Sequence, residues 1–106
     1  KNFHYMIEEK LYVIVRSDFS KARKAVQAGQ AVAKFVQVFP YVWRNKTLIY
    51  LRVSDEKELS KLLDKLLANA YKVVEYREPS WNNSLTAVAA FSNEEVDKLI
   101  KDLKLL

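Results

Sequence analysis

The sequence contains no cysteine, and among its 106 residues it has one histidine, one glycine and two prolines. Without cysteine there is neither a disulfide framework nor a thiolate metal site, which fits a reducing compartment. His4 is the single histidine, and it leaves almost no material for an imidazole metal site or a Ser-His triad. So little glycine and proline excludes flexible linkers. We therefore expect no metal and no cofactor.

Long apolar runs are also absent. No stretch approaches the roughly 18 residues of a membrane span, and no signal-peptide core is visible. We expect a cytoplasmic protein with no membrane association. Residues 1–9 are interpreted as an N-terminal extension or tag remnant, and residues 10–106 as a single domain with one modest core.

The charge is unevenly distributed. Residues 1–53 contain ten Lys or Arg and three acidic residues, whereas residues 54–106 contain eight and ten. A basic half suggests an anionic partner such as tRNA, another RNA or a phosphate ligand. The alternative is that the lysines only keep a small domain soluble.

The alternation of apolar and polar segments along the chain predicts the element order βαβαββα. The predicted strands are 10–17, 47–53, 71–77 and 85–91, and the first helix is 19–38, with Asp18 or Ser20 as its N-cap. Ser54 caps a second helix, whose buried face is predicted to comprise Leu59, Leu62, Leu63, Leu66 and Leu67. A Ser92–Glu95 capping box opens the last helix, which extends to about Lys104. The expected fold is a three-layer α/β sandwich around a mixed four-stranded sheet.

The first helix is rich in small residues and has a polar stripe. Gly29 lies in its middle, either to allow tight helix packing or to let a ligand approach the backbone. The stripe, spaced i, i+4, i+7 and i+11, comprises Arg23, Gln27, Gln30 and Lys34. Arg16, Lys21 and Lys24 lie near its start, where basic groups at a helix N-terminus favour phosphate binding. The alternative is an ordinary solvated helix face.

The segment 78–86 gathers one carboxylate with hydroxyl and amide groups. Glu78 can orient water for attack on an ester, while groups such as Asn83 and Thr86 supply hydrogen bonds. An ordinary turn has the same composition. Trp81, like Tyr41 and Trp43 earlier in the chain, suits stacking on nucleobases, although such aromatics more often cover the core.

The first strand ends in Arg16-Ser17-Asp18, the next helix contains Arg23-Lys24-Ala25-Val26-Gln27, and the chain closes with Asp97 to Leu106. With these motifs in order, the chain resembles the type II peptidyl-tRNA hydrolases, particularly their small divergent phage and bacterial relatives. The resemblance covers nearly everything from Lys10 onward. It implies a cofactor-free enzyme that cleaves the ester between a peptidyl group and tRNA. It also implies homodimers, which are frequent among these relatives.

The resemblance assigns roles by position. The family lysine falls on Lys24 or Arg23, its essential acid on Glu78, and a threonine entering the fourth strand on Thr86. A shorter Glu-Pro-Ser-Trp-Asn-Asn-Ser segment replaces the family's Asp-Ala-Gly-Arg-Thr-Gln loop, and Gln30 stands where histidine is usual. We take the catalytic residues as Lys24, Glu78 and Thr86. The substrate-binding residues are taken as Arg16, Asp18, Lys21, Arg23, Gln27, Gln30, Lys34 and Asn83.

Three hypotheses follow for function. The first is hydrolysis of peptidyl-tRNA or N-blocked aminoacyl-tRNA. The second is a non-catalytic module on the same fold that binds tRNA, another RNA or a protein. The third is an enzyme acting on a different small ester or amide.

Overall fold

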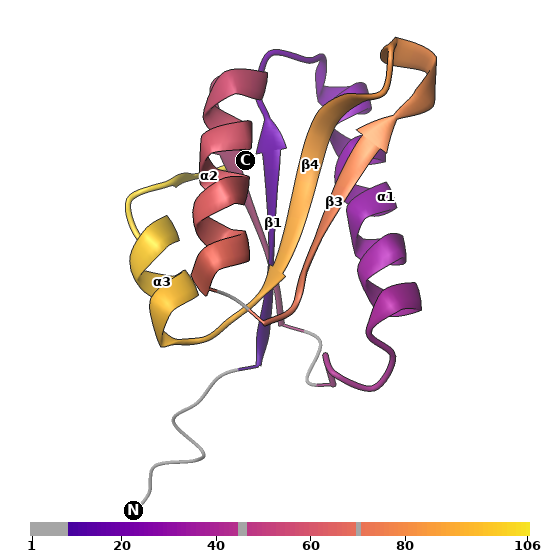
Figure 1. The fold of residues 1–106 in the computed structure, drawn as a ribbon. Coiled ribbons are helices and arrows are strands. Elements are labelled where there is room, and N and C mark those ends of the chain that lie inside the picture. Colours follow the sequence, from indigo (N-terminus) through magenta and orange to yellow (C-terminus); the bar gives the residue numbers. More distant parts are fainter. Residues whose placement is uncertain (1–8, 45–46, 70) are drawn as a thin grey trace, which may run out of the picture.

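The computed structural model describes residues 9–44, 47–69 and 71–106. Five strands form one sheet in the order β3-β4-β1-β2-β5, with helices on both faces (Figure 1). The strands are β1 (Lys10–Arg16), β2 (Thr47–Val53), β3 (Val73–Glu78), β4 (Ser84–Phe91) and β5 (Lys104–Leu105). The helices are α1 (Lys21–Val38), α2 (Glu56–Asn69) and α3 (Glu94–Ile100), with a short 3-10 turn at Pro79–Trp81. The predicted α/β class and its mixed sheet are confirmed.

Strand β1 lies at the centre of the sheet and is buried on both faces, which explains its continuous apolar run. Alternate side chains enter two separate cores. Leu11, Val13 and Val15 pack under α1, whereas Tyr12 and Ile14 pack on the side of α2 and α3. Strand β1 pairs in parallel with β2 and antiparallel with β4.

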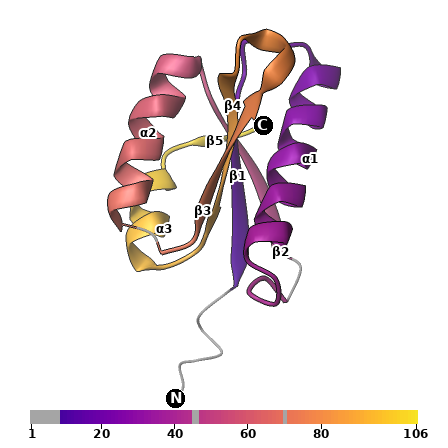
Figure 2. The same ribbon diagram turned by 45° about the vertical axis from the view of Figure 1, so that its right-hand side comes forward.

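The helices form two layers around the sheet. Figure 2 shows α1 on one face and α2 with α3 on the other. The crossover from β1 leads to its neighbour β2, and the next crossover returns past β1 to β3 at the far edge. Because these two connections run in opposite directions along the sheet, right-handed crossovers place their helices on opposite faces.

Small side chains bring α1 close to the sheet. Ala28 and Ala31 pack with Ala87 and Ala89 of β4, and Phe35 fills the far end of this core. Gly29, in contrast, is exposed, and a Cβ built on it would meet none of the described residues within 4 Å. Neither tight helix packing nor a close approach of another described segment therefore explains this glycine.

Helix α2 packs as predicted except at its last leucine. Leu59, Leu62, Leu63 and Leu66 are buried, while Leu67 is 57% exposed. Leu63 and Leu66 already cover the sheet at this turn, so Leu67 falls at the border of the helix's buried stripe. The prediction that Leu67 is buried was wrong.

The C-terminal segment differs from the prediction in three respects. Asn93, not Ser92, caps α3, because its side chain accepts a hydrogen bond from the Val96 amide. The helix ends at Ile100 rather than near Lys104. Residues 104–105 instead form β5, which pairs antiparallel with β2 and makes a five-stranded sheet. Backbone hydrogen bonds to the open edge of β2 replace the last helical turn, and Leu103 packs against the adjoining core.

Candidate functional site

The polar residues of interest gather at the carboxyl edge of the sheet. Strands β1, β2 and β3 run in the same direction, so the segments that follow them meet at one edge, at the top in Figure 1. The 17–20 turn leads into α1, and the 79–83 loop joins β3 to β4. Open α/β sheets commonly bind ligands at such an edge.

A β-bulge in β4 sets the first member of the site. Tyr76 pairs with Ala87 and Arg77 with Leu85, so Thr86 is an extra residue between the two pairs. The bulge turns the fully buried Thr86 side chain toward α1, where its hydroxyl donates to Gln27 Oε1 at 2.6 Å. The same hydroxyl lies 3.3 Å from the Tyr76 carbonyl oxygen. Thr86 thus joins β4 to the helix.

Gln27 extends this contact to the end of β3. Its amide Nε2 donates to Glu78 Oε1 at 3.0 Å, although Gln27 itself is only 2% exposed. Glu78 Oε2 accepts from the backbone amide and the hydroxyl of Ser80, at 3.2 and 3.0 Å. We call these four residues, Thr86, Gln27, Glu78 and Ser80, the polar relay. It brings together three of the predicted site residues, which lie up to 59 positions apart in the chain.

The relay holds Glu78 as a carboxylate. The hydrogen bond from Gln27, followed by those from Ser80, lowers the pKa of Glu78 below its ordinary value, and partial desolvation opposes them only weakly. A carboxylate offers about four acceptor positions, of which these donors occupy three. Glu78 can therefore accept one further hydrogen bond from a ligand or from water.

Arg16 and Asp18, both predicted to bind substrate, form an ion pair with each other. Arg16 Nε and Nη2 donate to the two Asp18 oxygens at 3.0 and 2.8 Å. This hydrogen bonding raises the pKa of Arg16 and lowers that of Asp18. Arg16 Nη1 also donates to the Leu85 carbonyl oxygen, and Glu56 of α2 accepts from the Leu85 amide. The pair fastens the start of β4 to the turn after β1.

Two aromatic rings, with planes tilted by 44°, and two arginines pack in a row beside the relay. The Arg16 guanidinium lies 4.5 Å from the centre of the Phe19 ring. Phe19 packs on Trp81 with ring centres 5.0 Å apart, and the Arg23 guanidinium lies 4.7 Å from the Trp81 ring centre. We call Arg16, Phe19, Trp81 and Arg23 the cation–aromatic stack. The stack joins the turn before α1 to the 79–83 loop.

The remaining predicted residues are spread over α1 and the loop. Lys21, Arg23 and Gln30 are exposed and Lys24 is half-buried. Lys34 donates to the Glu75 carbonyl oxygen at 2.6 Å, on the neighbouring strand β3. Gln27 points into the protein, so the predicted stripe is not continuous at the surface.

Asn83 and Asn82 shape the loop backbone. Their φ angles are 59° and 52°, in the left-handed region that asparagine tolerates better than most residues. Asn82 follows the 3-10 turn, and the Asn83 carbonyl oxygen faces Arg77. The described contacts of Asn83 therefore belong to the turn itself.

Phe19 was missed by sequence reasoning, as was the capping of the 3-10 turn by Glu78, whose side chain accepts from the Ser80 amide. Phe19 immediately precedes Ser20, which caps α1 by accepting from the Arg23 amide. An apolar residue before an N-cap commonly packs against a neighbouring segment, and this pattern was available in the sequence. Of the two N-cap candidates, Ser20 is confirmed.

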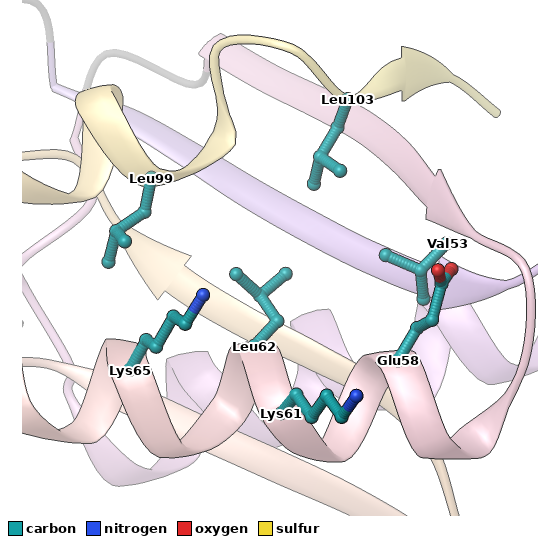
Figure 3. Close-up of a pocket in the computed structure, with 7 residues that line it drawn as sticks. All are labelled: Val53, Glu58, Lys61, Leu62, Lys65, Leu99 and Leu103. Atoms are coloured by element: carbon teal, nitrogen blue, oxygen red, sulfur yellow. The ribbon is translucent and has the colours of Figure 1, made fainter.

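An open hollow lies on the opposite face of the sheet (Figure 3). It has a volume of about 260 Å³ and lies between α2 and the α3–β5 segment. Its apolar lining is Val53, Leu62, Leu99 and Leu103, with Glu58, Lys61 and Lys65 around them. The hollow contains none of the predicted site residues, so the candidate site remains at the carboxyl edge.

Across residues 9–44, 47–69 and 71–106, no group of three or more His, Asp or Glu side chains is placed to hold a metal ion. Within the same residues, no helix has the length and apolar character needed to cross a bilayer.

Comparison with known proteins supports the fold alone. No protein-family model and no curated protein matches the chain. A solved structure of a protein of unknown function from Agrobacterium tumefaciens is similar, with a TM-score of 0.74. The match covers 95% of this chain and 99% of that chain at 16% sequence identity. Two chains of nearly equal extent thus share one architecture.

Proposed function

We propose that this protein binds the acceptor end of tRNA and hydrolyses the ester that joins a peptidyl or N-blocked aminoacyl group to the terminal ribose. The observation that supports it is the polar relay, which joins Glu78 to Thr86 through Gln27 beside a basic helix start. The resemblance of the Arg16-Ser17-Asp18 and Arg23–Gln27 segments to peptidyl-tRNA hydrolases supports the same substrate class.

In this proposal Glu78 acts on the attacking water. Its remaining acceptor position takes a hydrogen bond from water, which attacks the ester carbonyl carbon while its proton passes to the carboxylate. The carboxylic acid then returns the proton to the ribose oxygen as the ester bond breaks. Lys24 and Arg23 attract the phosphates of the acceptor strand.

In this proposal the buried residues of the polar relay act on the substrate only through Glu78. Thr86 is fully buried and Gln27 nearly so, which leaves them no direct contact with a substrate. Their role is to fix the carboxylate of Glu78 in one orientation, as a positioning pair. Arg16 and Asp18 in turn fix the turn before α1.

A second candidate is a binding module without turnover, and one observation favours it. Three hydrogen bonds lower the pKa of Glu78, and a carboxylate with a lowered pKa is a weaker general base. The basic residues at the start of α1 would then bind RNA without cleaving it.

The experiment is release of the acyl group from N-acetyl-aminoacyl-tRNA by the purified protein. Glu78→Ala is compared with Glu75→Ala, a matched carboxylate on the same strand. Release by the wild type and Glu75→Ala, with loss in Glu78→Ala, is the expected result. Equal release by Glu78→Ala would remove Glu78 from the reaction.

Absence of turnover has two distinguishable outcomes. Binding of tRNA that weakens steeply with salt, without acyl release, would favour the binding module. Neither binding nor release by a folded protein would contradict both candidates.

A further inference from the structure

The two ends of the cation–aromatic stack are chemically different. At the inner end, the Arg16 guanidinium is held by Asp18 and by the Leu85 carbonyl oxygen. At the outer end, Arg23 is exposed, and within the described part of the chain its guanidinium has neither an ion pair nor a hydrogen bond. Trp81 therefore contacts a planar cation whose N–H groups have no hydrogen-bond or ion-pair partner among residues 9–44, 47–69 and 71–106.

We propose that the Arg23 guanidinium, backed by Trp81, is a platform on which an unpaired nucleobase of the RNA stacks. Guanidinium planes stack on bases as well as on aromatic rings, so a base would continue the existing sequence of Arg16, Phe19, Trp81 and Arg23. The N–H edge of the same guanidinium stays free for a neighbouring phosphate.

The position of the platform identifies which base it takes. Trp81 lies three residues after Glu78, in the loop whose first residues close the polar relay. A base stacked on Arg23 is thus held next to the carboxylate proposed to act on the ester. This inference rests on the proposed function, and it assigns the platform to the terminal nucleotide of the acceptor end.

Preorganisation explains why Arg23 suits this role better than the other cations of α1. Lys21 and Lys24 attract phosphates as point charges, whereas a guanidinium is planar and stacks. Contact with Trp81, whose ring centre lies 4.7 Å from the guanidinium, restrains the Arg23 side chain before the RNA arrives, so less side-chain freedom is lost on binding.

The experiment uses two short single-stranded RNAs that end like a tRNA acceptor arm. One is intact, and the other lacks the terminal base but keeps the sugar and phosphate. Affinities of the intact protein for both are measured by fluorescence anisotropy, at fixed salt, for the wild type, Arg23→Lys and Trp81→Phe. Arg52→Lys, an exposed arginine on β2, is the matched control.

We expect the wild type and Arg52→Lys to bind the intact RNA about 10-fold more tightly than the abasic RNA, since stacking on one base accounts for such a ratio. Arg23→Lys keeps the charge and loses the plane, so its two affinities become equal. Trp81→Phe retains an aromatic backing and keeps part of the preference.

Three results would overturn the platform. Equal wild-type affinity for both RNAs would show that phosphates alone are bound, with the proposed function left standing. A preference retained in Arg23→Lys would place the base elsewhere. If neither RNA binds the folded wild type, the proposed function fails and the platform with it, a result distinct from the first two.

Discussion

The Thr86 hydroxyl lies 2.6 Å from Gln27 Oε1, in a contact where Thr86 is fully buried and Gln27 is 2% exposed. Thr86→Val keeps the shape of the side chain and removes the donor. Water cannot replace that donor, so we expect the free energy of unfolding to fall by about 1–3 kcal/mol. Urea denaturation measures the loss. Gln30→Leu, on the exposed side of the same helix, should change stability by less than about 0.5 kcal/mol.

A double-mutant cycle gives this contact a sharper test. Combining Gln27→Leu with Thr86→Val removes both partners, so no polar atom of the pair remains buried alone. The double variant should lose less stability than the two single losses together. Strict additivity would show that the two side chains do not depend on each other.

Gly29 is expected to be replaceable with a gain in stability. Gly29→Ala adds a Cβ that meets nothing within 4 Å in the described part of the chain, and it reduces the freedom of the unfolded chain. The free energy of unfolding should rise by about 1 kcal/mol, the difference in helix propensity between the two residues. Ala25→Gly, also exposed on α1, should lower it by a similar amount. A loss of stability in Gly29→Ala would contradict this expectation.

The relay should make stability depend on pH through Glu78. Hydrogen bonds from Gln27 and Ser80 lower its pKa in the folded state, so its contribution is present above the ordinary value of 4.5 and is lost as the pH falls through the lowered pKa. Glu78→Gln cannot titrate. The melting temperature of the wild type should exceed that of Glu78→Gln at neutral pH, and the gap should narrow in acid. A gap independent of pH would contradict this assignment.

Element positions were predictable where one side chain pattern dominated. The apolar run of β1 and the leucine spacing of α2 were sufficient to predict these elements, because β1 is buried on both faces and α2 on one. Strand β5 was not predictable, because Lys104 and Leu105 gain order only from the free edge of β2. Two residues have no periodicity of their own, and the decisive hydrogen bonds come from a strand more than 50 residues away.

Three members of the polar relay were singled out from the sequence, but the contacts between them were not predicted. Glu78, Thr86 and Gln27 were singled out by residue type and resemblance, yet their mutual bonding depends on a bulge that the Leu85–Phe91 sequence does not reveal. The burial of Gln27 could have been predicted from its position on the helix. It precedes Ala31 and Phe35 by four and eight residues, so it shares their buried face of α1. An amide on that face indicates polar partners, and the half-buried Glu78 and the buried Thr86 provide them.

The alanine-lined contact of α1 with the sheet has a consequence for folding. A surface of small side chains is smooth, so a helix resting on it can slide or rotate at little cost in packing. Gln27 removes that freedom, because its amide finds both a donor and an acceptor in a single placement of the helix. The buried glutamine thus fixes the position of α1 on the sheet, where packing of the alanines alone would allow several positions.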